Sequence, residues 1–437
     1  MRGPRRGLWR PLGVAATIVL AASTLSACSE SGKPTLNWYI NPDGQDTLTS
    51  LAEQCSTDEY DIAIQLLPTG ATDQRTQLAR RLAANDSTTD LMSLDPVFVP
   101  EFANADWLLE FEGDAADAVV DDDVLAGPAD TVQWEDKIYA APQWANTQVL
   151  WYRESLAEAA GISDALQEGT ATWSQVIDAA AQNDGTVGVQ ADRYEAYMVW
   201  INALVQGAGG DIVSDTEAGV DAQVDIDSDA GRAAAEVVAQ LAGSPAAQSD
   251  LSVSREGTSL GAMFPDGGAG EFMTNWTFVY KNYEPNDTNG FTDEQFADLA
   301  WARYPRTVEG EESKPPVGGI DIGVGAYTEH PEYALEAAQC VTTPEAQLAL
   351  AVNDGLMPAR SSVYEEQELV DAYDPTLLTL FRESIEDGGP RPKSAFYNQI
   401  SGSVQSTWHP PADVDPERTP ERSANFIRDV LGGKALL

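Results

Sequence analysis

The chain has 437 residues, of which 43% are hydrophobic, and its 70 acidic and 25 basic residues give a formal net charge of −45. This length and apolar content suffice for two lobes with separate cores. So negative a chain is a poor partner for nucleic acid or for an anionic membrane surface. We interpret the charge as solvated surface that maintains solubility.

The N-terminal segment has the pattern of a lipoprotein signal peptide. Arginines precede an apolar run over residues 12–22, and small residues then lead to Cys28. The apolar run is too short to span a membrane, which takes about 20 residues. The sequence predicts a signal peptide over residues 1–27, lipidation of Cys28 and a tether over residues 28–35. The alternative is an ordinary secretory signal with a chance cysteine.

Two cysteines remain once Cys28 is assigned to lipid. Outside the cytoplasm, an even pair such as Cys55 and Cys340 is expected to form a disulfide. The bridge would close a very long loop, for which the chain-entropy model gives on the order of 5 kcal/mol. The alternative is two buried free thiols. A bridge would place residues 51–55 and 334–341 in the same lobe.

Strands and helices alternate at the start of the mature chain, which predicts a parallel sheet. We expect strands at Leu36–Ile40, Asp61–Leu67 and Asp90–Leu94, and helices around Thr47–Cys55 and at Asp73–Ala84, the second capped by Thr72 or Asp73. Ligands of open α/β sheets bind beyond the carboxyl ends of the strands. Asp95 follows the third strand and is therefore predicted to face a crevice.

A second α/β half follows an extended segment over residues 137–153 that we interpret as a crossing from one lobe to the other. We expect a helix near Trp173–Ala181, a strand at Gly188–Gln190 and a long helix around Ala196–Ala208. Two such halves joined by extended crossings form a hinged pair of lobes. The predicted fold class is thus α/β, a two-lobed clamp with a central ligand cleft.

Motifs through most of the mature chain resemble those of family 1 extracellular solute-binding proteins of ABC transporters, of the maltose-binding type. The resemblance is most specific to the trehalose-binding lipoproteins of actinobacterial importers, whose two cysteines stand at similar places. The blocks that carry it are residues 73–82, 92–95, 146–153, Asn275-Trp276 with Phe278-Val279, 318–320, 355–360, and Arg391-Pro392 with Tyr397.

The resemblance implies a periplasmic-binding-protein-like fold whose chain passes three times between the lobes. We expect these crossings near Pro142–Asn146, Gly318–Gly323 and Gly355–Pro358. The implied division places residues 36–143 and 321–355 in lobe 1, and residues 144–320 and 356–437 in lobe 2.

The resemblance also implies a sugar site in the cleft. Sugars present hydroxyls and apolar C–H faces, so their sites need carboxylates or amides, a guanidinium and aromatic platforms. Trp276 resembles the stacking tryptophan of the family. Trp144 is a second candidate platform, although the family pattern has a small or polar residue at that position. The predicted ligand-binding residues are Asp95, Asn146, Glu256, Trp276, Gly319, Ile320, Arg391 and Trp144.

Each of these side chains also has a structural interpretation. The alternatives are a helix cap for Asp95, a turn residue for Asn146, a buried core residue for Trp276, a solvated charge in an exposed loop for Glu256 and a surface ion pair for Arg391.

The expected function is binding of a neutral disaccharide, trehalose first, and its delivery to ABC permease subunits driven by a separate ATPase. We expect a monomer without cofactor or metal, held to the extracytoplasmic face of the cell membrane by lipid alone. Maltose, another glucoside or another solute are the alternative ligands. A surface adhesin fits the anchor but not the two lobes.

The competing class is an enzyme, a glycoside hydrolase with Asp95 and Glu256 as acid and base. Both histidines, His330 and His409, precede prolines in expected loops, and no Gly-x-Ser-x-Gly elbow or phosphate-binding Gly-Lys-Ser/Thr loop occurs. These observations favour a binding protein over an enzyme.

Overall fold

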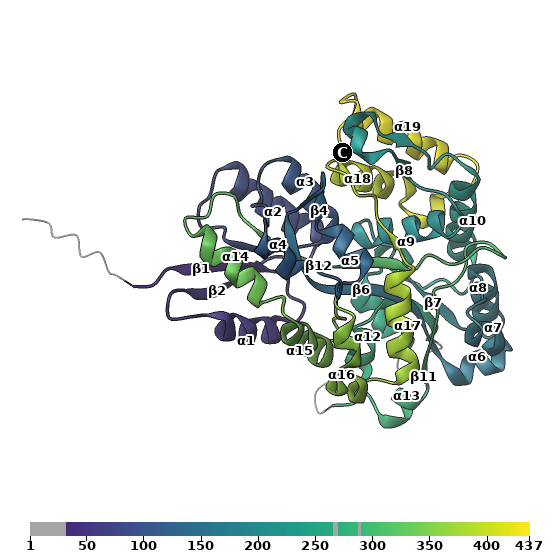
Figure 1. Cartoon of the computed structure of the whole chain (residues 1–437). Helices are drawn as coiled ribbons and strands as arrows, with labels where there is room; N and C mark the ends of the chain where they lie inside the picture. The colour runs from purple at the N-terminus through teal and green to yellow at the C-terminus, as the bar shows by residue number, and fades with distance from the viewer. Residues whose placement is uncertain (1–31, 265–269, 287–289) are drawn as a thin grey trace, which may run out of the picture. The chain divides into compact units, whose positions relative to one another are not determined.

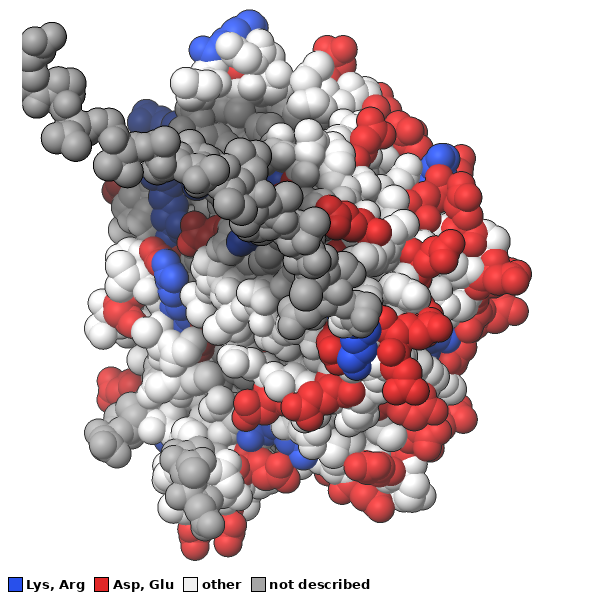
Figure 2. Space-filling view, turned by 90° about the vertical axis from the view of Figure 1, so that its left-hand side faces the viewer, with Lys and Arg blue, Asp and Glu red and all other residues white. Residues whose placement is uncertain are grey.

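The computed structural model describes residues 32–264, 270–286 and 290–437. Residues 34–437 form one compact unit (Figure 1). The predicted signal peptide and Cys28 lie outside the described residues, so lipidation stays a prediction. In the described part, no helix combines the length and the apolar character that a membrane span requires. In Figure 2 most of the charged side chains are acidic, and they gather on the right-hand side of the view, as expected for solvated charge.

The elements predicted for the first half of the fold are confirmed. Strands β1 (Thr35–Ile40), β2 (Asp61–Leu66) and β3 (Leu91–Leu94) alternate with helices α1 (Gln45–Cys55) and α2 (Ala71–Ala83). β1 lies between β2 and β3 and is parallel to both. The predicted cap of α2 is wrong, because the helix begins two residues early and Gly70 stands at its N-cap without a side-chain hydrogen bond.

The second half contains helices α8 (Trp173–Gln182) and α9 (Glu195–Gln206), as predicted. Strand β7 (Thr186–Gly188) ends two residues before the predicted strand does. The physical reason is that the backbone N–H of Val189 donates to the side chain of Gln248, and that of Ala191 to the loop at Ser254, instead of to a strand.

Two long strands, β6 (Ala140–Arg153) and β12 (Pro316–Val324), are shared by both halves. The sheet order is β2-β1-β3-β12-β6-β10-β7, with β11 (Leu299–Ala302) beside β6 and β13 (Gly389–Pro390) beside β12. The prediction of a parallel sheet holds for β1, β2 and β3 but is wrong for β12, which is antiparallel to β3 and β6. β6 carries the chain from the first half to the second and β12 carries it back, so the two adjacent strands run in opposite directions.

The three segments predicted as crossings lie side by side. Ala145 in β6 pairs with Gly319 in β12 on one side and with Met357 on the other, where its N–H donates to the Met357 carbonyl at 2.8 Å. The lobe boundaries given above remain a proposal. The pairing shows that any hinge at these segments consists of three adjacent extended chains.

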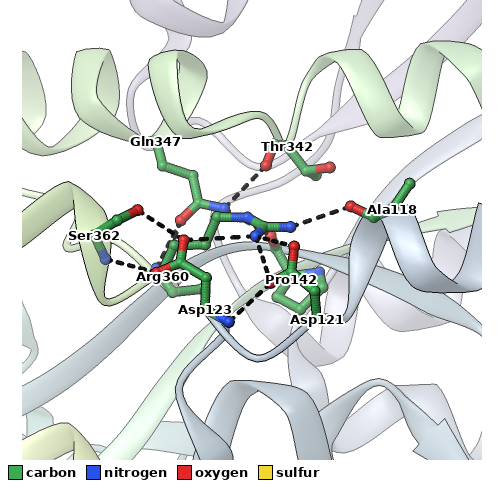
Figure 3. A network of polar contacts seen from close by, with 9 residues as sticks. Ala118, Asp121, Asp123, Pro142, Thr342, Gln347, Arg360 and Ser362 are labelled. Carbon is green, nitrogen blue, oxygen red and sulfur yellow. Dashed lines mark hydrogen bonds and ion pairs between the residues drawn. The ribbon is translucent and has the colours of Figure 1, made fainter.

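A buried amide ties the first of these segments to the residues that directly follow the third. Gln347, in helix α15 (Pro344–Asp354), donates from Nε2 to the carbonyl of Pro142 at 3.2 Å, and its Oε1 accepts from the N–H of Ala359 at 2.9 Å and of Arg360 at 3.2 Å. Figure 3 shows Arg360 beside this amide, with its guanidinium turned to Asp121, whose two oxygens lie 2.8 and 2.9 Å from Nη1.

The structure joins Cys55 to Cys340, as predicted. The two residues end α1 and helix α14 (Pro331–Cys340), and their Cα atoms lie 5.9 Å apart. Both helices pack on the apolar cluster that contains Leu36, Trp38 and Ile322. The bridge therefore connects elements of one core, in accordance with their predicted common lobe.

A fully buried carboxylate lies in β10 (Gly270–Trp276), the strand beside β6. Glu271 is 0% exposed, and within the described part of the chain neither of its oxygens has a hydrogen-bond partner. A Cβ at Gly185 would lie 2.0 Å from Oε2, so the side chain fits against a bare backbone. Burial, opposed in part by Arg153, raises the pKa of Glu271 to about 7.

We predict that Glu271→Gln stabilises the protein above neutral pH. A folded-state pKa above the ordinary value of 4.5 means that the contribution of Glu271 to stability is fully present below pH 4.5 and is lost as pH rises through about 7. The variant should gain about 2 kcal/mol over the wild type at pH 8 and little at pH 5 in urea unfolding. Glu309→Gln, at an exposed glutamate, is the control. A gain independent of pH would contradict the prediction.

Candidate functional site

All eight residues predicted to bind the ligand line one cavity of about 750 Å³. This volume is in the range of small-molecule sites, about 300–1,000 Å³. The cavity is lined by residues that follow the carboxyl ends of β1, β2 and β3. Residues of the crossing strands β6 and β12, and Arg391, complete the lining. The structure thus brings together side chains that are up to about 300 residues apart in the sequence. Their roles as ligand contacts stay a prediction.

The crossing strands form one wall of the cavity. Gly319 has φ of 144°, and a Cβ at this position would lie 2.3 Å from the Trp144 carbonyl oxygen. Only glycine permits this approach of β12 to β6. Ile320 and Trp144 are buried, at 4% and 6% exposed, in one apolar cluster with Leu356. Trp144 is therefore mainly a core residue, with little of its indole facing the cavity.

Trp276 supplies a more exposed aromatic surface. It ends β10 and is half-buried. Its six-membered ring lies against Gly318, where an added Cβ would be 3.4 and 3.5 Å from Cη2 and Cζ3. The rings of Tyr194 and Phe278 also line the cavity. These aromatic surfaces suit an apolar face of a ligand.

Asn146 is both a structural residue and a cavity residue. Its Oδ1 accepts from the backbone N–H groups of Thr147 at 3.0 Å and Thr277 at 3.3 Å. The hydroxyl of Thr277 lies 2.7 Å from this oxygen and 2.7 Å from the carbonyl of Gly355, at the third crossing segment. The amide oxygen of Asn146 therefore already accepts hydrogen bonds from the protein, and only its Nδ2 group remains to bind a ligand.

Asp95 and Arg391 form a bidentate ion pair. Nη1 of Arg391 donates to Oδ2 of Asp95 at 3.1 Å, and Nη2 donates to Oδ1 at 2.6 Å. The carboxylate also caps the short helix Pro96–Phe98 by accepting from the N–H of Val97 at 3.5 Å. Arg391 is only 7% exposed, so the surface ion pair weighed above for this residue is wrong.

Glu195 is the partner that sequence reasoning missed. It is the first residue of α9, is 7% exposed and accepts from Nη1 of Arg391 at 2.8 Å. Burial raises the pKa of Glu195, and the adjacent Arg391 charge opposes that rise. Its signal in the sequence is weak, since a lone glutamate before an apolar run is typical of any first helical turn.

Glu256 is not in an exposed loop, and that expectation is wrong. It is the first residue of helix α11 (Glu256–Met263), is half-buried and accepts from the Tyr194 hydroxyl at 2.7 Å. Burial raises the pKa of Glu256, and the hydrogen bond from Tyr194 lowers it. The neighbouring Arg255 is paired with Asp192 at 2.7 Å.

Other cavity residues follow strands in the way that Asp95 follows β3. Asn41 and Asp43 come after β1, and the Asn41 amide donates to the Asp43 carboxylate at 2.7 Å. The Asn-Pro-Asp-Gly turn could have indicated them by the rule that was applied to Asp95. The lining residues not predicted are Asn41, Pro42, Asp43, Gly44, Thr69, Gly70, Ala71, Gln74, Tyr194, Glu195, Ala196, Val199, Arg255, Gly257, Thr258, Phe278, Gly318, Asp354 and Leu356.

Comparison with known proteins gives a family match and several similar folds. The family model described as bacterial extracellular solute-binding protein matches residues 41–348. Maltose-bound MalE3 of T. maritima is 22% identical with a TM-score of 0.78, over 90% of this chain and 99% of that one. The GacH receptor of Streptomyces glaucescens, solved unliganded and with acarbose, is 20% identical with a TM-score of 0.75, over 92% and 100%.

A third structure is an ABC transporter solute-binding protein of Thermotoga lettingae bound to α-D-tagatose. It is 18% identical to this chain, has a TM-score of 0.75 and covers 92% of this chain and 100% of its own. At such identities the similarity shows the fold, which is the two-lobed clamp of the maltose-binding type.

We predict that Gly319→Ala destabilises the protein, whereas Gly257→Ala does not. Both glycines line the cavity, but an alanine at 319 has an unfavourable φ and meets a carbonyl oxygen, while at 257 nothing lies within 4 Å of the added Cβ. Gly319→Ala should lose about 2 kcal/mol or more of the free energy of unfolding, and Gly257→Ala less than about 0.5 kcal/mol, in urea titrations. Equal free energies of unfolding for the two variants would show that the close approach of Gly319 to the Trp144 carbonyl does not require glycine.

Proposed function

The chain belongs to the family of bacterial extracellular solute-binding proteins, and from this premise we propose that it binds a neutral disaccharide for an ABC importer, with trehalose as the first candidate. The observation that carries the proposal is the cavity. It lies between the two lobes and combines the half-buried Trp276 with hydrogen-bond donors and hydrogen-bond acceptors that the protein holds in place.

The chemistry of the cavity suits hydroxyl groups. The Asp95 carboxylate keeps acceptor capacity beyond its bonds to Arg391, since each carboxylate has about four lone-pair sites. Glu256 offers a second acceptor, and Nδ2 of Asn146 offers a donor. Sugar hydroxyls both donate and accept, so one ring can use all three groups while its C–H face stacks on Trp276.

Binding is expected to close the clamp. Asp95 lies in the half built on β1, β2 and β3, while Glu256 and Trp276 belong to the half built on β10 and α11. A ligand that contacts all three bridges the two halves and stabilises the conformation in which they approach. The permease subunits would then recognise the closed surface, and a separate ATPase would drive transport. A lipid anchor at Cys28 would hold the protein beside them.

Other solutes are the main alternative. The similar structures are described with maltose, acarbose and tagatose, and further ones with D-mannitol and ribitol. A glycoside hydrolase is less well supported, because both oxygens of Asp95 are bound to a guanidinium instead of being free to act as a base. The family match likewise favours binding without reaction.

We predict that calorimetric titration of residues 34–437 detects binding of trehalose in preference to maltose, sucrose and glucose. Asp95→Ala and Trp276→Ala should each weaken it at least about tenfold, because one removes a central acceptor and the other a stacking surface.

Matched controls exist for both variants. Asp298 is a carboxylate paired with Arg153, and Trp301 is half-buried, and neither lines the cavity. Asp298→Ala and Trp301→Ala should leave affinity unchanged. Binding of another sugar with the same dependence on Asp95 and Trp276 would replace trehalose as the ligand. Lack of binding to every sugar would refute the proposed function.

A further inference from the structure

Both arginines that line the cavity are already paired with carboxylates of the protein. Arg255 reaches Asp192, with Nε 2.7 Å from Oδ2. Arg391 reaches Asp95 and Glu195 at 2.6 and 2.8 Å. Among the lining residues that the structure describes, no cation is left without an acidic partner.

The donors of Arg391 can be assigned one by one. A guanidinium has five N–H groups. Nη1 donates to Asp95 and to Glu195, and Nη2 donates to Asp95. Nε is buried and has no partner among residues 32–264, 270–286 and 290–437. One N–H of Nη2 therefore remains, and Nη2 lies 3.7 Å from an added Cβ on Gly318, beside the indole of Trp276.

Glu195 is held so firmly that its carboxylate acts as a fixed counter-ion. Oε1 accepts from Arg391 and from the Tyr397 hydroxyl, while Oε2 accepts from Ser401 at 2.7 Å and Gln405 at 3.4 Å. These three donors are spaced four residues apart on helix α18 (Tyr397–Trp408), so they form one stripe facing Glu195. These four donors and the Arg391 charge favour the ionised form, and so oppose the rise in pKa that burial causes at Glu195.

We propose that Glu195 is a specificity-determining positioning residue, which with Asp95 masks the Arg391 guanidinium and thereby excludes sugars that carry phosphate or carboxylate groups. The proposal rests on the proposed function, since it concerns the ligands of the same cavity. Glu195 orients Arg391 so that its fork of Nη1 and Nη2 faces Asp95. A neutral hydroxyl needs only the single remaining N–H of Nη2.

An anionic ligand needs two parallel N–H donors from Arg391, and the pairing with Asp95 and Glu195 does not leave such a pair for it. Phosphates and carboxylates bind arginine through two parallel hydrogen bonds from one edge of the guanidinium. Asp95 occupies the edge formed by Nη1 and Nη2. On the other edge Nε is buried, so that edge offers a ligand the single remaining N–H of Nη2 instead of two parallel donors. Asp95, Glu195 and Arg391 together carry a net charge of −1, so the local potential repels an anion. The net charge of −45 adds repulsion at longer range.

The test is Glu195→Gln, which keeps the shape of the side chain and removes its charge. The ligands are trehalose, trehalose 6-phosphate and inorganic sulfate, measured by calorimetry and by the sulfate-dependent rise of Tm. We expect the ratio of affinities for the neutral sugar over its phosphate to fall about tenfold. Sulfate raises the Tm of most proteins because it is excluded from their surface, so we expect its rise to be larger in the variant than in the wild type. Glu271→Gln, another buried glutamate that lies outside the cavity, should change neither readout.

Asp95→Asn is a second variant for the case in which Glu195→Gln does not fold. Asp95 is partly exposed, and its amide form frees the fork of Arg391 from a negative charge. It should also gain sulfate binding. Equal weakening of neutral and phosphorylated sugar in Glu195→Gln, without gain of sulfate binding, would make Glu195 merely structural and overturn the inference. If the wild type binds no sugar at all, the proposed function fails, and the sulfate measurements still decide whether the arginine is masked.

Discussion

The antiparallel pairing of β6 with β12 is the constraint on which the rest of the structure depends. It brings Asn146 opposite Gly318 and Ala145 opposite Gly319, and Met357 then adds the third chain at Ala145. This register places the first and second crossing segments side by side in one wall of the cavity. A shift by one residue would turn the faces of β12 over relative to β6 and would take Gly319 away from its place opposite Ala145.

Charge is organised differently inside the cavity and on the surface. Outside, acidic residues are numerous and solvated, and their individual positions matter little. Inside, each arginine has a defined carboxylate partner, and the helix N-termini of α9 and α11 present Glu195 and Glu256 at their first positions. A carboxylate at a helix N-terminus is favoured by the helix dipole, so the fold itself stabilises the acidic lining.

Much of the fold could be predicted because periodicity and turn residues are local signals. The strands and helices around β1, β2 and β3 followed from them, and so did Asp95, whose position after a strand has a general meaning. The family resemblance supplied the remaining predicted cavity residues, which no spacing in the sequence would have brought together.

What could not be predicted depends on contacts between distant residues. Glu195 gains its importance from Arg391, almost two hundred positions away, and from one stripe of α18. The burial of Glu256 depends on Tyr194 in the same way. The saturation of the Asn146 oxygen required Thr277, and the antiparallel direction of β12 required knowledge of its neighbours. Sequence reasoning identified residue types suited to a sugar but could not count the hydrogen bonds that the protein already uses.

The position of β1 has a mechanical consequence for a chain that is held at its N-terminus. β1 is the first element of the compact unit and is flanked by strands on both sides, with six residue pairs in register with β2. A pull along residue 34 would load these ladders in shear, so that many hydrogen bonds would have to break together. Had the chain entered through an edge strand or a terminal helix, the same force could have peeled it away one bond at a time. The entry point would therefore resist such a force if the predicted lipid anchor at Cys28 holds the chain.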